Sequence, residues 1–176
     1  MSALVPDAAI AARLRVVDEH IGMENRHDLE GIMQTFGADA SYDDEPWNAH
    51  YHGRDEVRGF YADMLRALPD LTIDVQRRHV AAEAIILEVV IAGHHLGDWR
   101  GLMATGRPVA FPLCGIFTFD QNDRLAGEKI YYDRAMVLRQ LGVFHEPDTP
   151  PGRVAIAVTH PLTMLQIAAR KLLRRE

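Results

Sequence analysis

The hydrophobic pattern of the sequence changes its period once, near Pro69. Before this proline, apolar residues recur every three or four positions, as in residues 57–68, and so mark one face of a helix. After it, apolar and polar residues alternate, beginning with residues 71–76, which is typical of a strand. A chain with its helices first and its strands later is predicted to fold as α+β, with the helices gathered on one face of an antiparallel sheet.

The pattern predicts three helices before Pro69. The first carries apolar residues at 10, 14, 17 and 21, the second follows the capping residue Asp28 and includes Phe36, and the third follows Gly53. Strands are expected over residues 71–76, 83–93, 108–119 and 124–132, and a short helix over 133–141. Glycines inside or beside these strands are candidate positions for bulges or bends: Gly93, Gly101 and Gly115.

A segment rich in proline divides the chain. Residues 145–152 hold three prolines and a glycine, which predicts a linker between a domain of residues 1–144 and a basic amphipathic helix of residues 153–176, with Pro161 as an alternative start. Residues 153–176 contain five basic residues and one acidic residue, a balance of +4, so the net charge of −6 leaves −10 for the rest. We interpret these cations mainly as favourable charges at a helix end. Contact with an anionic membrane, or with the acidic body of the protein, is the alternative.

Composition excludes several classes of protein. With 48% hydrophobic and 25% charged residues, the chain is neither disordered nor fibrous. Its apolar runs are far shorter than the ~20 residues that span a bilayer, and no secretory signal is visible. Cys114 is the only cysteine, so an intrachain disulfide is excluded. We therefore expect a cytoplasmic protein, and the negative charge argues against a nucleic-acid partner.

Three segments resemble a known superfamily. Residues 25–47 (NRHDLEGIMQTFGADASYDDEPW) and 53–65 (GRDEVRGFYADML) resemble the nuclear transport factor 2-like proteins, and residues 16–65 also resemble ketosteroid isomerases. Residues 101–142, with their TGR turn and final LRQLG, are similar to the SnoaL-like polyketide cyclase branch. The resemblance covers residues 10–142 and implies a cone: a curved antiparallel sheet wrapped around three N-terminal helices, with the C-terminal helix as an addition.

The resemblance also implies partners. It implies a small hydrophobic molecule bound in an apolar pocket without a cofactor, and a homodimer formed through the open face of the sheet. We expect four apolar strand residues to supply that outer face: Val89, Ile91, Val109 and Phe111.

The chemistry that the resemblance implies is removal of a proton beside a carbonyl, which needs a carboxylate base and a donor to the enolate oxygen. Alignment with the isomerases puts Asp44 at the base position, with Asp43 beside it. Since neighbouring strand residues face opposite ways, only one of the two can face the pocket. His20 and Tyr61 take the positions of the oxyanion tyrosine and its partner, so we expect them to meet inside the cone.

Other family positions hold unexpected residues. The second oxyanion donor falls at Cys114 or Gly115, the cyclase acid/base falls at Ile130, and the histidine that assists it falls near Ile116. By strand alternation Glu128 and Tyr132 share a face with Ile130, so Glu128 becomes the alternative acid or base and Tyr132 a hydrogen-bond donor. Glu128 is expected to lie among Phe117, Ile130 and Val90, where burial would raise the pKa of its carboxyl group.

Ligand contacts are expected from six residues around these groups: Asp43, Trp47, His52, Cys114, Ile116 and Ile130. Trp47, His50 and His52 would form a polar, aromatic loop at the pocket mouth. No metal is expected, because the adjacent His94 and His95 would point to opposite sides of a strand.

The sequence leaves three functions open. The first is a cofactor-free isomerase or cyclase that acts on a small hydrophobic carbonyl or polyketide-like compound. The alternative is a non-catalytic module for ligand binding or dimerisation. The third, which the resemblance implies because the superfamily also hosts it, is an epoxide-hydrolase-like reaction. It calls for an Asp-Arg-Asp set, for which Asp98 and Arg100 are candidates.

Overall fold

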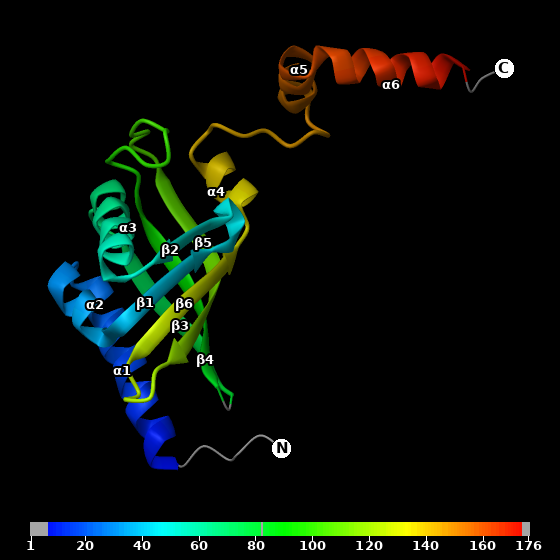
Figure 1. Cartoon of the computed structure of the whole chain (residues 1–176). Helices are drawn as coiled ribbons and strands as arrows, with labels where there is room; N and C mark the ends of the chain where they lie inside the picture. Colours follow the sequence, from blue (N-terminus) through cyan, green and yellow to red (C-terminus); the bar gives the residue numbers. More distant parts are fainter. Residues whose placement is uncertain (1–6, 82, 174–176) are drawn as a thin grey trace.

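Six strands form one curved sheet, and the three N-terminal helices lie against one of its faces (Figure 1). The computed structural model describes residues 7–81 and 83–173. The helices of the domain are α1 (Asp7–Asn25), α2 (Leu29–Thr35), α3 (Arg54–Ala67) and α4 (Arg134–Gln140). The strands are β1 (Phe36–Asp44), β2 (Ala49–His52), β3 (Thr72–Val80), β4 (Ala84–His94), β5 (Pro108–Phe119) and β6 (Leu125–Tyr132). This arrangement confirms the α+β cone.

The strand order in the sheet is β2-β1-β6-β5-β4-β3. Strands β3 to β6 form the expected antiparallel meander, whereas β1 runs parallel to β6. Phe36 begins β1 and is not part of the second helix, so that expectation was wrong. The cause is Arg54, the first residue of α3, whose guanidinium donates to the carbonyls of Met33, Phe36 and Gly37 and so satisfies the end of α2.

The helix boundaries follow the signals in the sequence. Asp28 caps α2 by accepting a hydrogen bond from the backbone N–H of Gly31 at 2.9 Å. Asp133 caps α4 in the same way, through the N–H of Met136 at 3.1 Å. Helix α3 ends at Ala67, two residues before Pro69. Local capping chemistry therefore sets where these helices begin and end.

The curvature of the sheet comes from positions other than the predicted glycines. The pairing of β4 with β5 runs in unbroken register through Gly93 and Gly115, so neither is a bulge. Register shifts lie between Val75 and Arg77, between Thr118 and Phe119, and in β1. Gly101 does mark a bend, since its φ of 78° lies in the region that favours glycine.

The core lies between the helices and the odd-numbered face of β4 and β5. Val89, Ile91, Val109 and Phe111 are all buried in it, so the expectation that they cover the outer face was wrong. The physical reason is the parity of the strands: helices α1 and α3 cover the face with odd numbers, and even-numbered neighbours such as Val90 point outward and are half-buried.

The C-terminal segment forms two helices where one was expected, α5 (Pro150–Thr159) and α6 (Pro161–Leu173). Helix α5 begins inside the expected linker, where Thr149 caps it, and Pro161 begins α6 after a break at His160. The two helices extend away from the sheet (Figure 1). Among the described residues, no helix combines the length and apolar character needed to cross a membrane.

Candidate active site

A cluster of buried polar side chains lies between α1, α3 and β6. His20 is fully buried; its Nδ1 lies 2.8 Å from the hydroxyl of Thr35 and its Nε2 lies 3.0 Å from the hydroxyl of Tyr61. That hydroxyl donates to Oε2 of Glu128 at 2.5 Å. The prediction that His20 and Tyr61 meet inside the cone is confirmed, and Glu128 is buried with them. We call these residues, together with Glu24, the inner cluster.

Glu24 belongs to this cluster although sequence reasoning did not find it. Glu24 is buried one turn after His20, and its Oε2 lies 3.7 Å from Nε2 of His20. This oxygen has no hydrogen-bond partner. A signal was available, because Val17, His20, Ile21 and Glu24 follow one another at helical spacing on the buried face of α1. A glutamate at the next position of an apolar helix stripe indicates a buried carboxyl group.

The protonation states of the inner cluster follow from burial and from charges close by. Burial raises the pKa of Glu24 to about 8, so this carboxyl group is largely protonated at neutral pH. Burial alone would lower the pKa of His20, but the carboxyl groups of Glu24 and Glu128 in their ionised forms outweigh it and raise this pKa above 6.5. Burial also holds the pKa of Tyr61 well above its usual range. The phenol of Tyr61 therefore remains a donor.

A second cluster, which we call the outer cluster, is built around Asp44 at the end of β1. Asp44 is fully buried; its Oδ2 accepts a hydrogen bond from Nη2 of Arg100 at 2.6 Å, and its Oδ1 has no hydrogen-bond partner. Burial raises the pKa of Asp44, even though the charge and hydrogen bond of Arg100, the backbone N–H of Trp47 and the hydroxyl of Tyr132 oppose that change. The guanidinium of Arg100 lies 5.0 Å from the ring centre of Trp47 and 5.4 Å from that of Trp99.

Tyr132 completes the outer cluster from the end of β6. Its hydroxyl accepts a hydrogen bond from Nε1 of Trp47 at 2.7 Å, which leaves its own proton available to another acceptor. Burial and the charge of Asp44 raise the pKa of Tyr132 well above its usual range. Trp47 thus touches the cluster, as expected for a residue near the pocket.

The two clusters lie at opposite ends of an apolar interior. A cavity of about 20 Å³ is lined by Glu24 and Glu128, and a cavity of about 30 Å³ by Asp44, Trp99 and Tyr132. Both cavities share the same apolar walls: Tyr42, Met64, Ile91, Leu113 and Ile130. A third cavity of about 30 Å³ lies under Trp47 and Arg100. Each has room for about one or two waters, so a larger ligand requires side chains to move.

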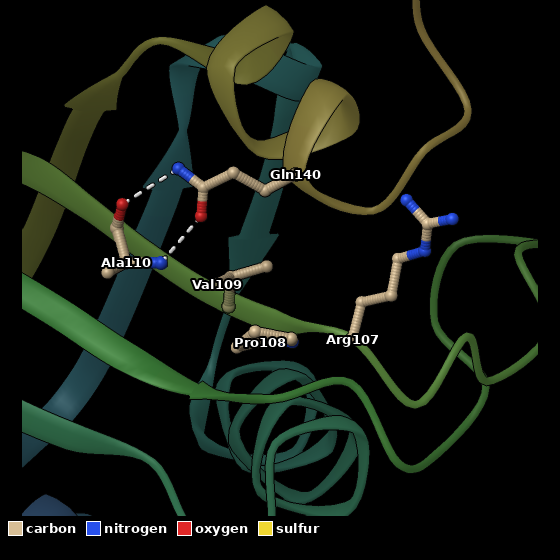
Figure 2. A pocket seen from close by; sticks show the side chains of 5 residues that line it. All are labelled: Arg107, Pro108, Val109, Ala110 and Gln140. Carbon is tan, nitrogen blue, oxygen red and sulfur yellow. Dashed lines mark hydrogen bonds between the residues drawn. The ribbon is translucent and has the colours of Figure 1, made fainter.

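A larger depression of the surface lies elsewhere (Figure 2). It measures about 560 Å³ and is lined by Arg107, Pro108, Val109, Ala110 and Gln140. The amide of Gln140 exchanges two hydrogen bonds with the backbone of Ala110, at 2.7 and 2.8 Å, and so covers an open stretch of β5 (Figure 2). Because its lining has no acid and Arg107 as its only ionisable group, this depression is a poor site for acid–base chemistry.

Several residues expected at the pocket lie outside it. Cys114 and Ile116 point to the outer face of the sheet, between the inward-facing Leu113, Gly115 and Phe117. Asp43 also faces outward, 2.8 Å from Nδ1 of His50 and 3.4 Å from Nζ of Lys129, so Asp44 is the residue of the pair that faces the interior. His52 is exposed on β2. Val90 faces outward too, and Val89 lines the cavity beside Glu128 in its place.

The remaining candidates divide between site and surface. Arg100 joins the outer cluster, whereas Asp98 is exposed and accepts from the N–H of Ala104 at 2.9 Å. His94 pairs with Asp70 at 2.6 Å. Within residues 7–81 and 83–173, no three His, Cys, Asp or Glu side chains are arranged to hold a metal ion.

Comparisons with known proteins place these residues in a family context. A family model described as SnoaL-like polyketide cyclase matches residues 12–141. Solved structures with a similar fold include AclR from Streptomyces galilaeus (21% identity, TM-score 0.66, covering 77% of this chain and 98% of that one). They also include IdmH from Streptomyces antibioticus (22% identity, TM-score 0.60, covering 74% of this chain and 99% of that one). A third is the epoxide hydrolase/cyclase-like enzyme SalBIII (15% identity, TM-score 0.60, covering 69% of this chain and 91% of that one). No curated protein matches.

Proposed function

This chain belongs to the SnoaL-like polyketide cyclase family, and we propose that it is an enzyme in which Asp44 removes a proton beside a carbonyl group of a small hydrophobic molecule. The proposal includes both outcomes of that step. The proton can return at another carbon, which is isomerisation, or the carbanion can attack a second carbonyl carbon and close a ring. Neither route consumes a cofactor.

One observation carries this proposal: the carboxylate of Asp44 is buried and has one oxygen free. Arg100 holds Oδ2 at 2.6 Å, so the position of the carboxylate is fixed while Oδ1 has no partner. Because burial raises the pKa of Asp44, its carboxylate is a stronger base than one in water. A base that is fixed, buried and unpartnered on one side is suited to accept a proton from carbon.

Two groups beside Asp44 can stabilise the enolate oxygen that forms. The phenol of Tyr132 lines the same cavity, Trp47 donates to its oxygen, and its own proton lies close enough to Asp44 for their hydrogen bond to lower the pKa of that carboxyl group. The same proton can pass to an enolate oxygen that forms beside Asp44. The guanidinium of Arg100 adds a positive charge beside this cavity. The inner cluster, at the other end, offers the protonated carboxyl group of Glu24 as a donor to a second oxygen of the substrate. The proton of Tyr61 is already donated to Glu128, so His20 and Tyr61 position the carboxyl groups of this cluster.

The experiment compares Asp44→Asn with Asp43→Asn, since Asp43 is the neighbouring carboxylate that faces outward. The full chain is mixed with a panel of phenols and hydrophobic ketones, and both the melting temperature and the exchange of the α-proton in D₂O are followed by calorimetry and NMR. We expect ligands to raise the melting temperature of the parent and of Asp43→Asn. Proton exchange should fall at least about 100-fold in Asp44→Asn alone. Equal exchange by Asp44→Asn, or no thermal shift with any ligand, would refute the proposal.

A second candidate is hydrolysis of an epoxide, which the Asp44–Arg100 pair favours. A water on the free Oδ1 of Asp44 could attack the epoxide carbon, with its proton passing to Asp44, while Tyr132 protonates the leaving oxygen. The Asp-Arg-Asp set is incomplete, because Asp98 lies outside the site. SalBIII, which is described as having a role in pyran ring formation, shares the fold. Incubation of the same two variants with a small hydrophobic epoxide separates this reaction from proton abstraction.

A further inference from the structure

The C-terminal helices α5 and α6 expose apolar side chains. Val154, Val158, Leu162, Leu165 and Ile167 are each more than half exposed, whereas the apolar residues of β4 and β5 that face the helices are buried. The two helices contact each other where they join and stand apart from the sheet (Figure 1). We call residues 150–173 the C-terminal arm.

The exposed residues are arranged in stripes. On α6, Leu162 and Leu165 form an apolar stripe, while Thr163, Gln166 and Arg170 recur at helical spacing to form a polar one. On α5, Val154 and Val158 lie one turn apart and so share a face. Each helix therefore has an apolar stripe that water contacts in the isolated chain.

Charge indicates what covers this surface. Residues 153–176 carry +4, from five basic residues against one acidic, and the rest of the chain carries −10. An anionic surface attracts the C-terminal arm and repels the negatively charged rest of the chain. The molecule is therefore oriented with the arm toward that surface. Pairing with the arm of a second copy is disfavoured, because like charges repel and α6, with 13 residues, is short for a coiled coil.

We propose that the C-terminal arm docks on the surface of an anionic phospholipid bilayer. Leu162, Leu165 and the valines of α5 enter the boundary between headgroups and acyl chains, and Arg170 and Lys171 lie among the lipid phosphates. Docking of this kind holds the sheet domain in the water beside the bilayer. The inference is independent of the chemistry proposed for Asp44.

The test is binding of the full chain to vesicles of phosphatidylcholine with and without phosphatidylglycerol, measured by co-sedimentation. We expect binding to the mixed vesicles only, and weaker binding at high salt. Arg170→Gln with Lys171→Gln should weaken binding about 25-fold, since each cation near an anionic surface is worth about fivefold. Leu162→Gln with Leu165→Gln should weaken it at least about tenfold.

Matched controls lie on the body of the protein. Arg66→Gln with Arg77→Gln removes two exposed cations, and Leu96→Gln with Met103→Gln replaces two exposed apolar residues. Both double variants should bind like the parent. Absence of binding to either vesicle, or equal losses in the control and arm variants, overturns the proposal. A dimer without lipid that dissociates in the arm variants also overturns it, in favour of a second copy as the occupant.

Discussion

The buried carboxyl group of Glu24 leads to a quantitative prediction about pH. In the folded protein the pKa of Glu24 is about 8, against 4.5 for an ordinary glutamate. Between these two values the unfolded chain has lost a proton that the folded chain still holds, so the free energy of unfolding falls as the pH rises. With 1.36 kcal/mol for each pKa unit, this effect amounts to about 3 kcal/mol between pH 5 and pH 8.

Glu24→Gln removes this titration while keeping the size of the side chain. The free energy of unfolding of the variant, minus that of the parent, should therefore increase by about 3 kcal/mol from pH 5 to pH 8. The prediction concerns this change with pH, so the intrinsic effect of placing an amide at the site cancels. The measurement is urea unfolding at several pH values, read by circular dichroism.

The matched control is Glu19→Gln, because Glu19 is an exposed glutamate on the same helix. Its stability profile should run parallel to that of the parent at every pH. If the Glu24→Gln profile also ran parallel to the parent, the carboxyl group of Glu24 would not hold its proton in the folded state. The description of the inner cluster would then be wrong.

Three further variants test hydrogen bonding and packing. Tyr61→Phe should lower the free energy of unfolding by about 1–3 kcal/mol in urea titrations, because it leaves buried groups of His20 and Glu128 without their hydrogen bonds. Gly97→Ala should lower it by at least about 1 kcal/mol, since the added Cβ would lie 2.3 Å from the carbonyl oxygen of Arg66. Gly59→Ala, at an open position within α3, should instead raise the free energy of unfolding by up to about 1 kcal/mol. If Gly97→Ala were the more stable of the two alanine variants, the close packing described at Gly97 would be wrong.

The fold could be predicted where the signal is local. The stripe of α3, the caps Asp28 and Asp133 and the alternation of β3 are properties of neighbouring residues, and the structure matches them. The errors arise where distant contacts decide. Phe36 fits the helical spacing of α2, but Arg54 ends that helix, and no local pattern reveals that the guanidinium returns to those carbonyls.

The candidate site shows the same division. Strand alternation correctly predicts that only one of Asp43 and Asp44 faces the interior. Which of them does so depends on which face of the sheet the helices cover. The same parity placed Cys114 and Ile116 outside and Val89 inside. Arg100 reaches Asp44 from a loop 56 residues away, and its backbone has a φ of 51°, so neither periodicity nor propensity could place it.

Two buried oxygens without hydrogen bonds support the proposal that the interior serves a reaction. Oδ1 of Asp44 and Oε2 of Glu24 are buried polar atoms without hydrogen bonds, a state that costs stability and is rare in folded proteins. Apolar side chains at both positions would fill the interior at lower cost, as they do at Met64 and Ile130 between them. One end of the interior thus holds a carboxylate fixed by Arg100, and the other holds a carboxyl group that is protonated at neutral pH. A base and a donor at opposite ends of one apolar space are what proton abstraction beside a carbonyl requires.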